Sequence, residues 1–367
     1  MTSPAVFAGL APRLKSQYAA ALKAGSLHFT DSDEVELEDE ATGIPFEVRY
    51  APALAKKPTA DMGPTSTAST ASDSKPVDPF APPYQQDLFV AEETVKEDDD
   101  DSGEGFAVLL NKFCVTPRHF LLVTKDFRKQ TTPLSPLETF TAWSILKQLG
   151  SREKHLAFFN CGDESGASQP HKHLQFIPIP TGMAPFDSFI DAHKPAKPQQ
   201  PFQLPLPYAN FTALLDPPSS ASRSDLVGYL GQRYLELLDL MIDHRRRLSL
   251  SDPAALGLEA PTRGMRLSEL SYNVVMTQQY IHLVPRRREK YTPRTSSSDA
   301  AAAAADGAQG CTVSVNALGF AGMVLVKDEA TLEAVKQVGV LEVLKEVGLP
   351  PLEFSDPQHA EDVGELA

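Results

Sequence analysis

The stretch that decides the fold is Asn160–Ile179, which reads NCGDESGASQPHKHLQFIPI. On a β-strand, residues two apart project from the same face. The sequence therefore predicts a strand over Lys172–Ile179 and places His171, His173 and Gln175 together on one side of it. The intervening side chains are expected to point the other way.

A loop rich in glycine and serine precedes this strand. Its main-chain N–H groups can form a nest that binds an anion. Neutral imidazole is a nucleophile at cytosolic pH, and a histidine beside such a loop is arranged to attack phosphorus and form a reactive phosphoramidate. Two other interpretations remain open: a metal site on the His171–His173 pair, for which glutamine is a poor third ligand, and ordinary polar packing.

The segments around this stretch predict an α+β fold with mostly antiparallel strands. Ser135-Pro136-Leu137-Glu138 is a capping box with proline at the first helical position, which predicts a helix to about Leu149. Further helices are predicted over 12–24, 224–247 and 328–347, the last with Asp328 as its N-cap. Strands are predicted over 26–39 and 44–50 as a hairpin, and over 107–113, 120–124, 156–160, 172–179, 272–277, 280–284, 312–316 and 322–326.

Stretches without a packing pattern divide the chain. Residues 58–83 are rich in Pro, Ser, Thr and Ala and run toward an acidic tract, so we expect a low-complexity insert at about 58–104. We expect a disordered insert at about 295–310 and interpret 195–207 as a connection. These limits predict an N-terminal domain over 1–195, which contains the two histidines and the glutamine, a C-terminal domain over 205–350 and an acidic tail over 351–367.

Composition excludes several classes of protein. The 367 residues carry a formal charge of −14, and residues 31–40, 87–104 and 351–367 hold −7, −8 and −5 of it, which leaves +6 on the remainder. The chain is long enough for a large core, and its three distant cysteines are interpreted as buried thiols in a reducing compartment. Neither a P-loop, a zinc finger nor an RNP motif occurs, so we expect no nucleic-acid binding. No apolar run reaches the roughly 18 residues of a membrane span, so we expect no membrane partner.

Three basic segments are interpreted mainly as surface features. His244–Arg247 lies at the end of a predicted helix, where cations complement the dipole, and Arg286–Arg288 follows a predicted strand. The stretch before Asp31 is basic, as mitochondrial presequences are, but the helical spacing of its apolar residues favours a surface helix.

Motifs spread along the chain carry a family resemblance. They are Tyr50–Pro58, Leu110–Phe113, Asn160–Gln175, Tyr272-Asn273, Val284–Arg286, and Asn316–Met323 with Lys327. The HxHxQ motif resembles the histidine-triad superfamily in the branch where glutamine replaces the third histidine. Together the motifs resemble the fungal-type diadenosine tetraphosphate phosphorylases, also called ATP adenylyltransferases, over about residues 10–350. The resemblance implies a histidine-triad-like fold, similar to that of the galactose-1-phosphate uridylyltransferases.

The resemblance also implies roles for individual residues. His173 would be the nucleophile that takes the adenylyl group, His171 would orient the site, and Gln175 would hydrogen-bond the α-phosphate oxygens. The other expected substrate-binding positions are Lys57, Asn111, Lys112, Asn160, Gly166, Ala167, Ser168, Gln169, Asn316, Ala317, Leu318, Met323 and Lys327. We expect no tightly bound cofactor and no metal ligands from the protein, with Mg²⁺ accompanying the polyphosphate.

The activity that the resemblance implies is reversible phosphorolysis of diadenosine tetraphosphate to ATP and ADP through a covalent adenylyl-histidine. The expected ligands are diadenosine polyphosphates, ATP, ADP and inorganic phosphate. We expect a monomer in the cytoplasm, with the nucleus as an alternative. A hexose-1-phosphate uridylyltransferase, a hydrolase and a non-catalytic dinucleotide sensor remain open as alternatives.

Overall fold

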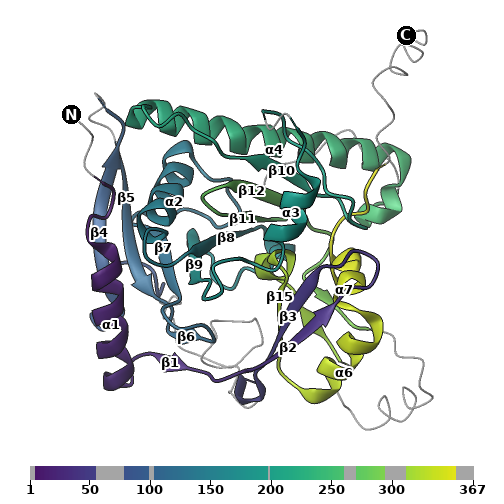
Figure 1. Ribbon diagram of the computed structural model, residues 1–367, viewed down its shortest axis with the longest axis horizontal. Helices are drawn as coiled ribbons and strands as arrows, with labels where there is room; N and C mark the ends of the chain where they lie inside the picture. Colours follow the sequence, from purple (N-terminus) through teal and green to yellow (C-terminus); the bar gives the residue numbers. More distant parts are fainter. Residues whose placement is uncertain are drawn as a thin grey trace, which may run out of the picture.

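A computed structural model describes residues 5–54, 78–98, 103–196, 199–259, 270–293 and 311–352. Its centre is an eight-stranded sheet in which every pairing is antiparallel, which confirms the predicted α+β class (Figure 1). The strands in spatial order are β10 (Phe211–Leu214), β12 (Tyr280–Pro285), β11 (Tyr272–Met276), β8 (His155–Cys161), β9 (His173–Pro178), β7 (Phe120–Thr124), β5 (Gly103–Leu110) and β4 (Phe89–Lys96).

The two halves of the chain meet in the middle of this sheet. β8 of the first half pairs with β11 of the second, and Asn160 lies opposite Asn273. A smaller sheet also joins the halves, because β15 (Met323–Val326) runs parallel to β3 (Pro45–Tyr50), which pairs with β2 (Asp33–Glu38). The shorter pairs are β1 (His28–Phe29) with β6 (Phe113–Cys114), and β13 (Lys290–Tyr291) with β14 (Val313–Ser314).

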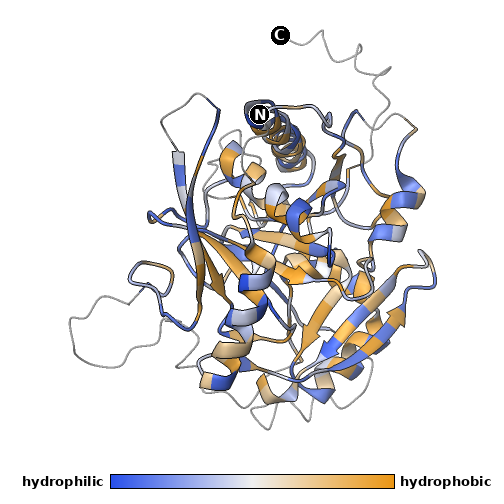
Figure 2. Cartoon of the chain, turned by 60° about the vertical axis from the view of Figure 1, so that its left-hand side comes forward, coloured by the Kyte–Doolittle hydropathy of each residue, from blue (hydrophilic) through white to orange (hydrophobic). Residues whose placement is uncertain are grey.

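Helices cover the two faces of the large sheet with two separate apolar cores. One core joins the sheet to α1 (Leu10–Ala24), α2 (Pro136–Leu149) and α4 (Arg223–Ser251). The other joins it to α3 (Asp187–His193), α6 (Glu329–Val338) and α7 (Val340–Val347). Figure 2 shows the apolar residues concentrated along the strands. Short 3₁₀ helices complete the described part: η1 (Pro52–Leu54), η3 (Asp163–Ser165), η4 (Pro253–Leu256) and η6 (Ala317–Ala321).

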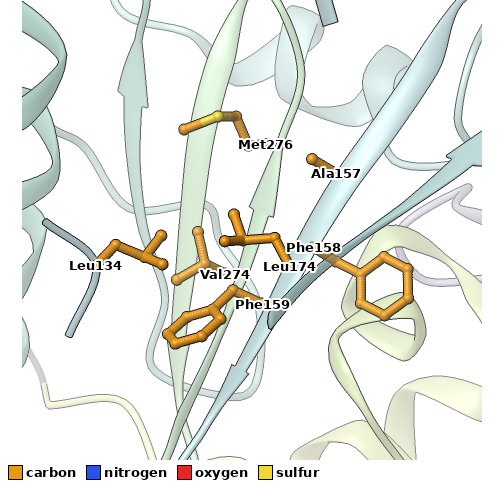
Figure 3. A pocket seen from close by; sticks show the side chains of 7 residues that line it. All are labelled: Leu134, Ala157, Phe158, Phe159, Leu174, Val274 and Met276. Carbon is orange, nitrogen blue, oxygen red and sulfur yellow. The ribbon is translucent and has the colours of Figure 1, made fainter. Parts of the chain in front are cut away.

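Apolar side chains pack closely on the face of the sheet toward α2. Six apolar side chains line a gap that has no space for a water molecule, and the neighbouring Phe158 directs its ring away from them (Figure 3). The six are Leu134, Ala157, Phe159, Leu174, Val274 and Met276. Among the described residues, no helix combines the length and the apolar composition that a membrane span needs.

Local sequence signals set several helix ends where they were expected. α2 begins with the predicted capping box, in which Ser135 and Glu138 each accept a bond from the other's main-chain N–H. Asp328 caps α6 through the N–H of Thr331. The single helix predicted over 328–347 is nevertheless wrong, because Gly339 adopts φ 82° and separates α6 from α7. A left-handed φ breaks the helical hydrogen-bond ladder, and glycine adopts it without steric cost.

Some expectations fail in the first half. The low-complexity insert predicted at about 58–104 is wrong for 78–98, because these residues include β4. β4 is an edge strand in which acidic exposed residues surround the buried Ala91 and Val95, so the sequence shows no clear alternation. The sequence also does not predict β10 or α3. The strand predicted over 26–39 is divided into β1 and β2, which pair with different partners.

Two further expectations concern the rest of the chain. Leu204 and Leu206, in the predicted connection, are buried in the second core. His244, interpreted as surface charge, is buried and its Nε2 donates to the carbonyl of Pro350. The predicted insert at 295–310 and the tail from 353 lie outside the described residues.

Candidate active site

His173 is the first residue of β9, and hydrogen bonds from its main chain hold it in place. Its main-chain N–H donates to Oε1 of Gln130 at 2.8 Å, and its carbonyl accepts from Nε2 of Gln130 at 3.2 Å. Its ring Nδ1 lies 2.8 Å from the carbonyl oxygen of His171. A carbonyl only accepts, so Nδ1 carries the proton and the neutral ring keeps its lone pair on Nε2. Burial lowers the pKa of His173 to about 4, so the ring is neutral at pH 7.

His171 is anchored on both ring nitrogens. Nδ1 lies 2.7 Å from Oδ2 of Asp78, and Nε2 lies 2.7 Å from the carbonyl oxygen of Thr124. A carboxylate and a carbonyl both accept, so each ring nitrogen of His171 has a protein partner within hydrogen-bond distance. Both nitrogens of His171 are therefore occupied by protein groups, whereas Nε2 of His173 is not.

Gln175 is oriented by a chain of side chains. Its Oε1 lies 3.0 Å from Nε2 of His119, and the ring of His119 is 3.2 Å from the amide nitrogen of Asn111. Burial lowers the pKa of His119 to about 4, so this ring is neutral. Donation from Asn111 to Nδ1 fixes the tautomer in which Nε2 donates to Gln175. The amide N–H groups of Gln175 are then left to donate to a ligand.

A second polar group lies on the adjacent strands. Gln130 also donates to the carbonyl of Asn160 at 2.7 Å, which links this group to His173. Oδ1 of Asn160 accepts from the amide of Asn273 at 2.8 Å and from the N–H of Ala317 at 2.9 Å. The buried Nδ2 of Asn160 has no hydrogen-bond partner in the described part of the chain. A buried donor without a partner is costly, and because Asn160 lies in one of the motifs that predicted substrate contacts, this donor is available to a ligand.

Arg286 bonds Asn273 of this polar group. The prediction that its basic run lies on the surface is therefore wrong for Arg286. Its side chain is 1% exposed and donates to Oδ1 of Asn273 and to the carbonyls of Val315 and Arg288. Burial lowers its pKa to about 9, so it is still charged at pH 7. The guanidinium therefore places a positive charge where the two halves of the chain meet. It can remain charged when buried because the carbonyls of the surrounding loops accept the hydrogen bonds that water would otherwise accept.

The glycine loop and η6 lie against each other. Gly166 adopts φ 79°, and a Cβ there would lie 2.9 Å from the carbonyl oxygen of Val315, so a side chain is excluded. Asn316 caps η6 through the N–H of Leu318. Asn160, Gly166, Asn316 and Ala317, predicted from distant segments, are thus neighbours in the structure.

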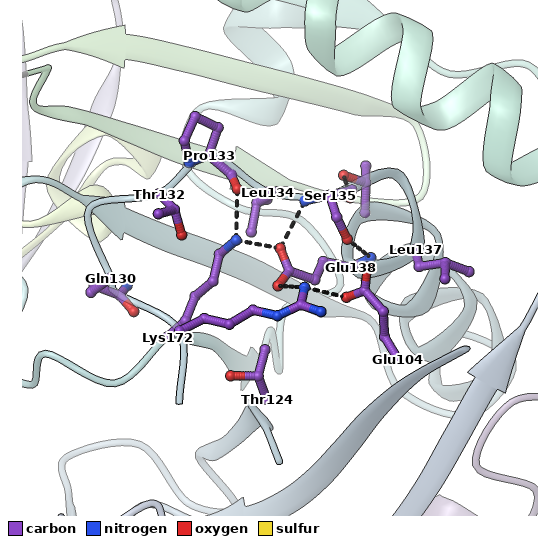
Figure 4. A network of polar contacts seen from close by, with 12 residues as sticks. Glu104, Thr124, Gln130, Thr132, Pro133, Leu134, Ser135, Leu137, Glu138 and Lys172 are labelled. Carbon is purple, nitrogen blue, oxygen red and sulfur yellow. Dashed lines mark hydrogen bonds and ion pairs between the residues drawn. The ribbon is translucent and has the colours of Figure 1, made fainter. Parts of the chain in front are cut away.

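The opposite side of β9 is anchored by a buried ion pair (Figure 4). Lys172, between the two histidines, points away from them as predicted, and its Nζ lies 2.6 Å from Oε2 of Glu138 and 2.6 Å from the carbonyl of Pro133. Arg128 joins Glu138 to Glu104. The strand that carries His173 is therefore tied to the first turn of α2.

Other predicted site residues are less enclosed. Lys112 is exposed and its Nζ lies 5.3 Å from the ring centre of Phe113. Lys327 is exposed beyond the end of β15. Ser168 is exposed, and the remaining members are partly buried: Ala167, Gln169, Leu318 and Met323. Lys57 lies outside the described residues. In the part of the chain that is described, no three His, Cys, Asp or Glu side chains are grouped to hold a metal ion.

The structure adds residues that the sequence interpretation did not assign to the site. They are Asp78, Phe80, His119, Gln130, Asn273 and Arg286. Two of them carry a signal, because Asn273 and Arg286 lie in motifs that already suggested the family.

Comparisons with known proteins agree along almost the whole chain. A family model described as the Ap4A phosphorylase N-terminal domain matches residues 4–191, and one described as the ATP adenylyltransferase C-terminal domain matches residues 204–350. Diadenosine 5',5'''-P1,P4-tetraphosphate phosphorylase 2 of Saccharomyces cerevisiae is 32% identical over 337 residues, which cover 88% of this chain and 89% of that protein. Protein APA1 of the same yeast is 26% identical and covers 92% of each.

Solved structures show the same likeness. The crystal structure of yeast Ap4A phosphorylase Apa2 matches with a TM-score of 0.68 at 28% identity, covering 95% of this chain and 99% of that one. The structure of Apa2 in complex with Ap4A matches with a TM-score of 0.68 at 27% identity, with the same coverage.

Proposed function

Because the chain belongs to the family of diadenosine tetraphosphate (Ap4A) phosphorylases and ATP adenylyltransferases, which are nucleotidyltransferases, we propose that it cleaves Ap4A with inorganic phosphate through a covalent adenylyl-histidine. The observation that carries this proposal is the state of His173. Its Nδ1 is bound to the carbonyl of His171, and its ring is neutral, so Nε2 has a lone pair for attack.

In the first step, Nε2 of His173 attacks the α-phosphorus of Ap4A. An N–P bond forms, the P–O bond to the departing triphosphate breaks, and ATP leaves. No base has to remove a proton from a neutral imidazole before attack. The positive charge that develops on the ring is stabilised because Nδ1–H already donates to the carbonyl of His171.

In the second step, an oxygen of inorganic phosphate attacks the same phosphorus. The N–P bond breaks, ADP leaves, and His173 returns to its neutral form. Each step is reversible, so the same residues join ATP and ADP into Ap4A when product concentrations favour it.

Two amide groups are placed to stabilise the transferred phosphate. The oxygen of Gln175 is engaged by His119, which turns its N–H groups toward the site, and Nδ2 of Asn160 is buried without a partner among the described residues. Donors that are already oriented act on developing phosphate charge without reorganisation. The buried charge of Arg286 adds favourable potential behind them.

Replacement of the nucleophile tests the proposal. His173→Ala should reduce phosphate-dependent release of ATP and ADP from Ap4A by about a thousandfold or more. The matched control is His193→Ala, since His193 is an exposed histidine on α3 and should be dispensable. With ATP labelled at the α-phosphate, the wild type should yield an acid-labile labelled protein and His173→Ala should not. Near-normal turnover by His173→Ala would overturn the mechanism.

A further inference from the structure

A short segment covers the two histidines of the site. The ring centre of Phe80 lies 4.9 Å from that of His173 and 6.2 Å from that of His171. His173 is only 3% exposed. The cover is thus aromatic and apolar where the imidazole would otherwise meet solvent.

Asp78 ties this cover to the site. One carboxylate oxygen bonds Nδ1 of His171 at 2.7 Å, and the other accepts from the main-chain N–H of Phe80 at 2.9 Å. One side chain therefore fixes both the second histidine and the residue that covers the first.

The sheet supports the cover from below. Phe80 packs with Tyr84 and Phe89 on a small apolar cluster formed by Ala107, Leu109, Leu121 and Val123. Val123 lies directly opposite His173 in the pairing of β7 with β9. Phe80 therefore packs on the cluster that contains the residue opposite His173, so the sheet itself holds Phe80 near the site.

The chemistry of the proposed intermediate gives such a cover a purpose. An adenylyl-imidazolium can be attacked by phosphate, which gives ADP, or by water, which gives AMP. Water is far more abundant than phosphate, so a phosphorylase has to keep it away from the phosphorus. A phenyl ring offers no group that could hold a water molecule there.

We propose that Phe80, positioned by Asp78, excludes water from the adenylated His173 and so makes phosphate the acceptor. This inference rests on the proposed function. In the normal step a phosphate oxygen forms the new P–O bond as the N–P bond breaks. When the cover is absent, a water oxygen forms that bond, AMP leaves, and the proton of water passes to solvent.

The test measures which acceptor is used. Full-length wild type and Phe80→Ala are incubated with Ap4A, phosphate and ¹⁸O-labelled water, and ATP, ADP and labelled AMP are quantified. Phe80→Ala should raise the AMP-to-ADP ratio by at least about tenfold. Phe80→Leu, which keeps an apolar cover, should stay near the wild-type ratio.

Two further variants complete the design. Phe127→Ala is the matched control, because Phe127 meets the ring of His171 but is already 58% exposed, so its loss should leave the ratio unchanged. Asp78→Ala, which releases Phe80 without removing it, should raise the ratio too, and it serves if Phe80→Ala fails to fold.

The outcomes separate the two proposals. If the wild type shows no phosphate-dependent ADP, the proposed function fails. If the wild type makes ADP but folded Phe80→Ala and Asp78→Ala keep its product ratio, the role of the cover is overturned and the function stands.

Discussion

β9 and β12 occupy matching places in the sheet but differ in what surrounds their histidines. Each pairs with a central strand, β8 or β11, and the two central strands pair with each other. Gln175, Phe158, Val275 and His282 lie opposite one another in a continuous row across these strands, so they share one face. His282 of β12 therefore projects from the same face as His173.

The two histidines are similarly buried and neutral. Burial lowers the pKa of His173 to about 4 and that of His282 to about 3. Yet Nδ1 of His282 bonds the hydroxyl of Thr212, and its Nε2 is buried without a partner in the described residues. The ring centre of Phe186, a member of the second core, lies 6.3 Å from that of His282.

The neighbouring positions explain the difference. Where β9 has Lys172 before its histidine and Gln175 two residues after it, β12 has the buried apolar residues Ile281 and Val284. The connection from β8 to β9 contains the glycine loop, whereas β11 and β12 are joined by the tight turn 277–279. Burial in the sheet is thus enough to make a histidine neutral, and the glycine loop and the polar neighbours are what distinguish the proposed phosphate site from the surroundings of His282.

The largest expected effect concerns the ion pair that β9 has and β12 lacks. Lys172→Met should lower the free energy of unfolding by about 3–5 kcal/mol, because it leaves Glu138 buried without its closest cation. Urea unfolding measures this change. The matched control is Lys336→Met in an exposed helical pair, where the change should stay within about 1 kcal/mol.

The ion-pair prediction has a second arm. The double variant Lys172→Met/Glu138→Leu should regain part of the loss, since an apolar pair replaces two buried charges. A loss below about 1 kcal/mol in the single variant would show that β9 needs polar anchoring no more than β12 does.

The next effect concerns Gln130, whose side chain bonds both the main-chain N–H and the carbonyl of His173. The corresponding surroundings of β12 are apolar. Gln130→Leu should lower kcat by about a hundredfold with a small change in KM, because the proposed nucleophile His173 is displaced while the proposed substrate-binding groups remain. Steady-state kinetics with Ap4A and phosphate measure both constants. The control is Gln148→Leu. Gln148 is half-buried, and its amide bonds the carbonyl of Val6 and no group of His173. Equal loss in KM and kcat would indicate a direct contact with substrate instead.

The sequence predicts what neighbouring residues determine. The capping box of α2, the hairpin of β2 and β3, and the two faces of β9 all follow from spacing within a few residues, and the structure confirms them. The proximity of Asn160 to Ala317 does not follow from spacing, since the two are far apart in sequence. The resemblance to a family supplied both residues, and the structure gives the hydrogen bond that joins them.

The missed residues depend on tertiary contacts. His119 acquires its role only because β7 pairs with β9 and brings Leu121 opposite Gln175. Asp78 lies within the proline-rich stretch 58–83, which has no local pattern. Arg286 lies in a basic run that is typical of a surface, and only the carbonyls of distant loops explain its burial. Composition and periodicity contain none of this information.

The smallest effect concerns His282, the buried histidine that β12 has in common with β9. His282→Leu should leave the proposed phosphorolysis unchanged, since the described residues around His282 include neither a glycine loop nor the polar neighbours of the proposed phosphate site. A histidine whose folded pKa is about 3 and whose unfolded pKa is about 6.5 binds more protons when unfolded, so it lowers stability as pH falls from about 6.5 toward 3. The free energy of unfolding of the wild type should therefore fall more between pH 7.5 and pH 5 than that of His282→Leu. The difference between the two falls should be roughly 2 kcal/mol. Thermal or urea unfolding at the two pH values measures this difference, and a loss of turnover at pH 7.5 would show that β12 takes part in the chemistry after all.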